Sequence, residues 1–120
     1  MKKALIIEDQ ILMRDLLAYL LENELYYDDI ESYEDGEAGL AACLKEPMPN
    51  LVLLDMILPK LGGLTVLRQI KQRCPDLAVF VVSSALTPES CKAVADSGVN
   101  AICTKDYPLD KMREAIRQVE

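Results

Sequence analysis

The 120-residue sequence predicts an α/β protein built on a doubly wound parallel sheet. Short apolar segments alternate with amphipathic segments along the whole chain. The central apolar segments are apolar at every position, which is typical of parallel strands covered by helices on both faces. One early strand segment is more polar and suits an exposed edge of the sheet. Together these observations predict five successive strand-helix units.

The apolar segments predict the strands, which are residues 4–7 (ALII), 51–54 (LVLL), 77–82 (LAVFVV) and, more weakly, 99–103 (VNAIC). The remaining strand, residues 29–34 (DIESYE), has only Ile30 and Tyr33 as apolar members. Such a composition fits a strand that is exposed along one side. We therefore place residues 29–34 at an edge of the sheet.

Apolar residues at helical spacing predict the helices between these strands. The clearest sets are Met13, Leu16, Leu17, Leu20 and Leu21, and then Leu109, Met112, Ile116 and Val119. Weaker patterns predict helices over residues 37–45, 64–73 and 88–97. Thr87 before Pro88 suits the start of the last of these, and Gly98 suits its end.

Alternating strands and helices imply right-handed crossovers and a parallel sheet. The strand order 2-1-3-4-5, as in flavodoxin-like (βα)5 sandwiches, puts the polar second strand at an edge. In this order the first and third strands lie side by side, and ligands bind at their carboxyl ends. The length fits one domain, residues 1–120.

Charge and cysteine content exclude several classes of protein. With 13 Lys and Arg against 20 Asp and Glu, the net charge of −7 disfavours direct contact with nucleic acid or anionic lipid. DNA contact would come only through an output domain outside this chain. The sequence has no His and no CxxC pair, so its four cysteines are expected to pack as small hydrophobes and not to bind zinc. No segment has the length of a signal-peptide core or a membrane span, so a cytoplasmic location is expected.

Polar residues follow each central strand segment at the same edge of the predicted sheet. They are Glu8 and Asp9 after the first, Asp55 after the third, Ser83 and Ser84 after the fourth, and Thr104 and Lys105 after the fifth. Any one of them would be ordinary in a loop. Three carboxylates at adjacent strand ends, however, would repel one another and raise at least one pKa unless a cation compensates.

Carboxylate ligands without His or Cys favour Mg²⁺, with Mn²⁺ as the alternative. Mg²⁺ in turn is usually shared with a phosphoryl group. Asp55 could then act as a nucleophile toward phosphorus, while the Ser83 hydroxyl and the Lys105 ammonium hold the phosphoryl oxygens.

The segments ALIIEDQILMRDLL, LVLLDMILPKLGG, VVSSA and AICTKD resemble the receiver domains of bacterial two-component response regulators, the CheY-like superfamily. The resemblance covers essentially the whole chain. The acid pair, a lone Asp followed by Pro four residues on and Gly eight residues on, the Ser and the Lys all occur in the order and spacing of that family. The resemblance implies the same flavodoxin-like fold.

By this resemblance Asp55 is the residue that is phosphorylated. Glu8 and Asp9 are the acidic pair that holds Mg²⁺ together with Asp55, and Ile57 offers its backbone carbonyl to the metal. The apolar neighbours of Asp55 leave it as the one reactive acid of its loop.

The resemblance also assigns Ser83 as the switch hydroxyl and Lys105 as the lysine that pairs with the phosphoryl group. The family usually has a Tyr or Phe three residues before this lysine, and here that position is Ile102, so the usual aromatic switch is absent. Asp106 stands where Pro is common, so no cis peptide is expected there, and the Lys-Asp pair favours the branch with a C-terminal helix-turn-helix domain. Leu58 in place of the frequent Met before Pro59 is a volume-conserving change.

The implied function is a signalling module that accepts a phosphoryl group from a histidine kinase or phosphotransfer protein and then changes conformation. The output would be another domain or a partner protein, with transcription favoured, and phosphorylation would favour a homodimer. Such a domain assists its own phosphorylation and hydrolysis but turns over no separate substrate. It is therefore not expected to be an enzyme.

Two other classes fit the fold less well. A phosphatase with an aspartyl-phosphate intermediate needs an acid two residues after the nucleophile, and Ile57 occupies that position. A flavodoxin-like electron carrier needs a phosphate cradle after the first strand, where the acidic sequence IIEDQ would repel phosphate.

Overall fold

One five-stranded parallel sheet forms the centre of the protein, in a computed structural model that describes residues 2–84 and 86–120. The strands are β1 (Lys3–Ile7), β2 (Asp29–Tyr33), β3 (Leu51–Leu54), β4 (Ala78–Ser83) and β5 (Ala101–Thr104). Their order is β2-β1-β3-β4-β5, as predicted, so β2 and β5 form the edges. The polar β2 is only half-buried, whereas every residue of β1 and β3 is buried.

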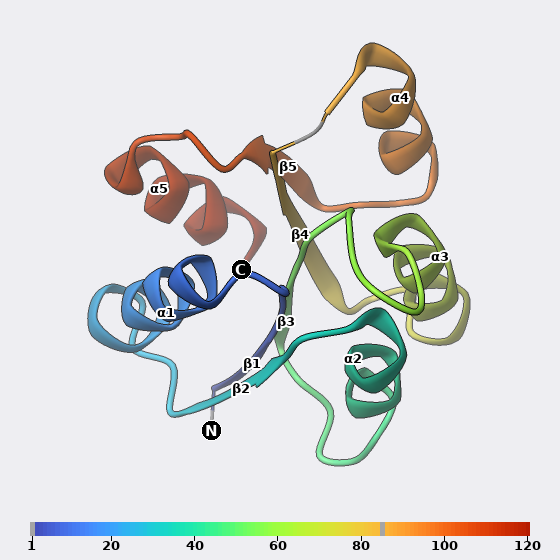
Figure 1. Cartoon of the computed structure of the whole chain (residues 1–120). Helices are drawn as coiled ribbons and strands as arrows, with labels where there is room; N and C mark the ends of the chain where they lie inside the picture. The colour runs from blue at the N-terminus through green and yellow to red at the C-terminus, as the bar shows by residue number, and fades with distance from the viewer. Residues whose placement is uncertain (1, 85) are drawn as a thin grey trace.

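Helices cover both faces of this sheet (Figure 1). One face carries α1 (Ile11–Tyr19) and α5 (Leu109–Val119), and the other carries α2 (Gly36–Cys43), α3 (Gly63–Arg73) and α4 (Pro88–Asp96). Side chains of a strand point alternately to the two faces, so Ala4 and Ile6 join one apolar cluster while Leu5 and Ile7 join the other. A strand with a buried core on each side must be apolar throughout, which explains the continuous apolar segments.

The first helix departs from its predicted pattern. It continues beyond α1 as one turn of π-helix, η1 (Leu20–Glu24), and its predicted apolar stripe is buried except for Leu16, which is 40% exposed. A π turn holds more residues than an α turn, so the spacing of apolar residues alone does not show it. Apart from this turn, α1 itself exposes large apolar side chains, namely Ile11, Leu12, Leu16 and Tyr19.

The ends of α4 follow the sequence prediction. Thr87 Oγ1 accepts a hydrogen bond from the backbone amide of Ser90 at 3.1 Å, and Ser90 Oγ accepts one from the backbone amide of Thr87 at 2.8 Å. This reciprocal pair satisfies backbone amides that the helix leaves free. Gly98 has a φ of +86°, a conformation that favours glycine after a helix.

The four cysteines form no disulfide, and Cys43 and Cys103 are buried among apolar side chains, as expected of small hydrophobes. Cys74 and Cys91 are only half-buried. Within the two described ranges, every helix is too short or too polar to cross a membrane.

The loop after β3 is held by close backbone contact at Gly63. The Gly63 amide donates to the carbonyl oxygen of Met56 at 3.0 Å, and a Cβ at Gly63 would lie 2.3 Å from the Asp55 carbonyl oxygen. Only glycine fits this approach without displacing backbone. Neither glycine of this loop has a positive φ; Lys60 has one, at 68°. A Cβ on Gly62 would meet only open space.

We predict that Gly63→Ala lowers the free energy of unfolding by about 2 kcal/mol or more, because the new methyl group overlaps fixed backbone beside Asp55. The matched control Gly62→Ala should change it by about 1 kcal/mol or less. Denaturant unfolding of the three proteins measures both effects. Equal effects at the two glycines would show that this loop relaxes and does not fix Asp55.

Candidate functional site

Backbone hydrogen bonds to neighbouring strands fix the residue that follows each of three strands. The amides of Glu8, Asp55 and Lys105 donate to carbonyl oxygens of Tyr33, Ile7 and Ser83 at 3.0, 3.0 and 3.2 Å. Because all strands are parallel, these three residues emerge at the same edge of the sheet. The backbone of the sheet therefore sets the positions of these residues, independently of contacts between their side chains.

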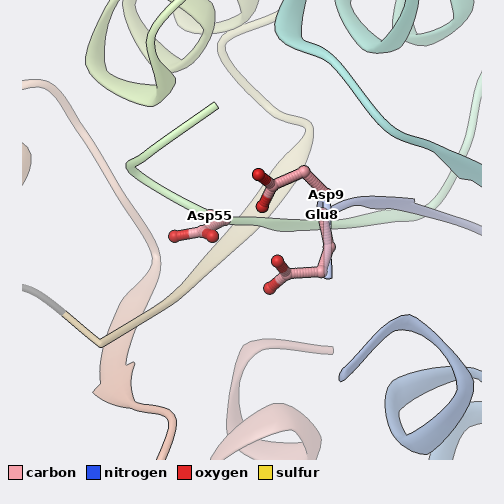
Figure 2. A group of neighbouring side chains, drawn as sticks. All are labelled: Glu8, Asp9 and Asp55. Carbon is pink, nitrogen blue, oxygen red and sulfur yellow. The ribbon is translucent and has the colours of Figure 1, made fainter. Parts of the chain in front are cut away.

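Glu8, Asp9 and Asp55 form a cluster of carboxylates at this edge (Figure 2). One oxygen of each lies within 4.8 Å of the others. Glu8 is 1% and Asp55 4% exposed, whereas Asp9 is exposed to solvent. The acid pair after β1 and the acid after β3 are thus brought together as the strand order predicts.

The ammonium group of Lys105 lies against this cluster. Its Nζ is 3.0 Å from Asp55 Oδ2 and 2.8 Å from Glu8 Oε1. The contact with Asp55 is a hydrogen bond, while the contact with Glu8 is an ion pair that lacks hydrogen-bond geometry, so Glu8 Oε1 is buried without a hydrogen-bond donor among the described residues. One ammonium thus partly neutralises three carboxylates.

Burial is the main reason that the pKa of Glu8 is raised. The ion pair with Lys105 and the hydrogen bond from the backbone amide of Gln10 lower the pKa of Glu8, and the charge of Asp55 raises it again. The sequence predicts a raised carboxyl pKa here, but through repulsion between carboxylates, which is the smaller cause. Burial would lower the pKa of Lys105, but hydrogen bonds and charges from Glu8 and Asp55 raise it overall.

The cluster has the composition that a hard divalent cation requires. All three side chains supply oxygen, two of them are buried, and Glu8 Oε1 accepts no hydrogen bond. Oxygen donors of this kind suit Mg²⁺ or Mn²⁺. Glu8, Asp9 and Asp55 could therefore hold such a cation.

The amide of Ile57 is part of the Asp55 environment. It donates to Asp55 Oδ1 at 3.2 Å, so the two oxygens of Asp55 have separate partners, the Ile57 amide and the Lys105 ammonium. The Ile57 side chain is exposed. The role of its backbone carbonyl as a metal ligand stays a prediction.

Ser83 and Ile102 lie apart from these contacts. Ser83 is fully buried, and its hydroxyl has no hydrogen-bond partner in the described parts of the chain. Ile102 is half-buried and packs against the apolar cluster beneath α2, α3 and α4.

Beside Lys105, a cavity of about 380 Å³ is lined by Ser84, Thr104 and Asp106. The Thr104 hydroxyl donates a hydrogen bond to Asp106.

Gln10 is a site residue that the sequence analysis missed. Its side-chain oxygen accepts a hydrogen bond from Lys105 Nζ at 2.8 Å, across 95 positions of the chain. A polar side chain directly after the acid pair was the available signal, but its partner becomes evident only when β1 and β5 are placed in space.

Residues 4–117 match the family described as the response regulator receiver domain. The chain belongs to this family. Receiver domains are the phosphorylation-dependent signalling modules of two-component systems, and response regulators interact with histidine kinases. The function that the sequence implies, and the family that it resembles, are both confirmed at this level.

Several response regulators are similar to this receiver domain in sequence. The response regulator ArlR of Staphylococcus epidermidis is 30% identical over 119 residues, which are 99% of this chain and 52% of that protein. The probable C4-dicarboxylate response regulator DctR of Halalkalibacterium halodurans is 25% identical over 98% of this chain and 51% of its own length. The chain thus spans about half the length of these curated relatives.

Solved structures of receiver domains share the fold. The Mn²⁺-bound form of the response regulator Rcp1 has a TM-score of 0.83 and 28% identity, covering 100% of this chain and 92% of that one. A receiver domain protein of Methanospirillum hungatei has a TM-score of 0.89 at 24% identity, over 98% of this chain and 92% of its own. Both support the fold of the receiver domain, and the first also carries a divalent cation.

We predict that Glu8→Gln stabilises the protein, without divalent cations, by an amount that grows as pH rises above about 4.5. The pKa of Glu8 is higher in the folded than in the unfolded state, so the folded state binds the proton more tightly. Ionisation of Glu8 therefore costs stability as pH rises from the unfolded pKa through the folded pKa, and Gln removes this cost.

Denaturant unfolding at a series of pH values measures this difference. Glu114→Gln is the matched control, since Glu114 lies exposed on α5. A stabilisation by Glu8→Gln that shrinks as pH rises would mean that the ion pair with Lys105 outweighs the burial of Glu8.

Proposed function

We propose that Asp55 is the phosphoryl acceptor of this receiver domain. The observation that carries the proposal is the pairing of Asp55 Oδ2 with Lys105 Nζ at 3.0 Å, beside two further acids and at the carboxyl end of β3. Asp55 is 4% exposed and follows the last residue of β3, so a donor would approach it at the carboxyl edge of the sheet. Lys105 is already in place to pair with the oxygens of an incoming phosphoryl group.

The proposed transfer is an in-line displacement at phosphorus. A carboxylate oxygen of Asp55 forms a new bond to phosphorus as the bond from phosphorus to a histidine nitrogen of the donor breaks, and the electron pair stays on that nitrogen. In the later hydrolysis, a water oxygen bonds to phosphorus as the bond from phosphorus to the Asp55 oxygen breaks, which releases inorganic phosphate and restores the Asp55 carboxylate. The domain assists these steps on itself and turns over no separate substrate, so we do not class it as an enzyme.

Glu8, Asp9, Asp55 and the backbone carbonyl of Ile57 are the proposed ligands of Mg²⁺, with Mn²⁺ as the alternative. A bound divalent cation supplies charge that offsets the negative phosphoryl oxygens. The three carboxylates and the unsatisfied Glu8 Oε1 support this assignment. Mn²⁺ in the structure of Rcp1, at 28% identity, supports it independently.

The proposed donor is a histidine kinase or a phosphotransfer protein that docks beside α1. This helix starts two residues after Asp9 and exposes several large apolar residues, namely Ile11, Leu12, Leu16 and Tyr19. Leu12 is 85% exposed. A partner covering this face would bring its own reactive residue over the carboxyl edge of the sheet, where Asp55 lies.

We further propose that residues 1–120 form one receiver domain whose output lies in another domain or in a partner protein. Relatives about twice as long, named as response regulators, support an output beyond the receiver fold, and two further relatives named as transcriptional regulators favour transcription. DNA would then be contacted outside this acidic chain, and phosphorylation would favour a homodimer. A cytoplasmic location fits four cysteines without a disulfide.

The proposed switch rests on Ser83 and Lys105. The buried Ser83 hydroxyl has no hydrogen-bond partner among the described residues, so a phosphoryl oxygen would give it one and draw it toward Asp55. Ile102, half-buried and aliphatic, cannot signal by burying an aromatic ring. The conformational change is therefore carried by Ser83 and by the backbone after β4.

The direct test of the acceptor is phosphorylation by a small acyl phosphate with Mg²⁺, followed by intact-mass spectrometry. We expect one added phosphoryl group in the unmodified protein and none in Asp55→Asn. Asp106→Asn, which alters an exposed acid near Lys105, is the matched control and should be labelled normally. Full labelling of Asp55→Asn would move the nucleophile to another residue, with Ser83 and Ser84 examined first.

For the switch, NMR spectra are compared with and without beryllofluoride, which stands in for the phosphoryl group on Asp55. Ser83→Ala should reduce the shift changes over residues 86–105, because a hydrogen bond worth about 1 to 3 kcal/mol is lost. Ser84→Ala, at the exposed neighbouring hydroxyl, is the control and should leave them intact. Unreduced changes in Ser83→Ala, or their loss in Ile102→Ala, would contradict this switch.

A further inference from the structure

Gln10 has no local task in the helix that it precedes. It occupies the cap position of α1 with extended backbone angles (φ −88°, ψ 119°), yet its side chain makes no capping hydrogen bond. Its backbone amide donates a hydrogen bond to Glu8 Oε2 at 3.1 Å. The side chain is therefore free to reach across the sheet edge, where its oxygen accepts from Lys105 Nζ at 2.8 Å.

Three side-chain oxygens surround the ammonium of Lys105, and they differ in kind: Asp55 and Gln10 accept hydrogen bonds from it, while Glu8 pairs with it by charge. Two are the carboxylates of Glu8 and Asp55, at 2.8 and 3.0 Å, and the third is the neutral amide oxygen of Gln10 at 2.8 Å. An ammonium has three protons to donate. Gln10 thus completes the set of partners around Lys105.

Only the two charged acceptors also belong to the group that could hold a cation. Glu8, Asp9 and Asp55 form that group, whereas the side-chain oxygen of Gln10 is a neutral amide oxygen that already accepts from Lys105. Hard divalent cations prefer carboxylate oxygens, and a cation beside Lys105 also repels its ammonium. If Glu8 and Asp55 bind a cation, their contacts with Lys105 weaken. The side-chain oxygen of Gln10 then remains as the partner that Lys105 does not share with the cation.

We propose that Gln10 is a positioning residue for Lys105, which keeps the ammonium at the site when Glu8 and Asp55 bind a divalent cation. The proposal rests on the proposed function, because it takes Lys105 as the group that pairs with phosphoryl oxygens on Asp55. Gln10 itself touches neither the phosphoryl group nor the cation. It acts by limiting where the flexible side chain of Lys105 can go.

The first test observes the Lys105 ammonium directly by NMR of lysine side-chain nitrogen, with Mg²⁺ alone as the added ligand. Lys105→Met assigns the signal. Without Mg²⁺ the ammonium should be protected from exchange in both the unmodified protein and Gln10→Met, because the carboxylates hold it. With saturating Mg²⁺, exchange in Gln10→Met should become about threefold to tenfold faster than in the unmodified protein.

Gln10→Glu keeps an oxygen acceptor and should retain the slow exchange, which separates a lost hydrogen bond from a disturbed fold. Equal exchange rates in the unmodified protein and Gln10→Met at saturating Mg²⁺ would overturn the proposal. Loss of protection in the unmodified protein on adding Mg²⁺ would overturn it as well, since Gln10 would then fail to hold Lys105.

The second test measures the rate of labelling by an acyl phosphate. Gln10→Met should be labelled about threefold to tenfold more slowly than the unmodified protein, but should cause no further loss in a Lys105→Met background. An equal loss in both backgrounds would show that Gln10 acts independently of Lys105 and would overturn the proposal. Failure of the unmodified protein to be labelled at Asp55 would instead refute the proposed function.

Discussion

The ammonium of Lys105 stands between two buried carboxylates, Glu8 at 2.8 Å and Asp55 at 3.0 Å. Burying an ionised carboxylate costs free energy unless the charge is paired. Here one ammonium pairs with two buried carboxylates, and Asp9 adds a third negative charge nearby. The site therefore keeps an excess of negative charge in its resting state. In the proposed function this excess attracts a divalent cation, whose charge would offset that of an incoming phosphoryl group.

The sheet holds these charges in place at some cost to stability. Glu8, Asp55 and Lys105 are each the first residue after a strand, and each is tied by its amide to the neighbouring strand. The contact of Gly63 with the backbone of Asp55 and Met56 shapes the loop that follows Asp55. The apolar interior on both faces of the sheet supplies the stability that offsets the burial of these charges.

The fold could be predicted from sequence because β1, β3 and β4 are apolar on both faces and β2 is not. Parallel strands then place their following residues together, which predicts the acid cluster and Lys105. The π turn after Tyr19 could not be predicted, since it shifts the helical spacing only locally. The contact from Gln10 to Lys105 was equally hidden, because it joins residues from opposite ends of the chain.

The central claim is that Lys105 and a divalent cation compete for the same carboxylates, and a calorimetric titration with Mg²⁺ tests it most directly. Removing the ammonium in Lys105→Met should tighten Mg²⁺ binding by about tenfold, whereas Asp9→Asn should weaken it by a similar factor. Lys111→Met, on the exposed surface of α5, is the control and should leave the affinity unchanged. Unchanged or weaker binding of Mg²⁺ to Lys105→Met would contradict the account.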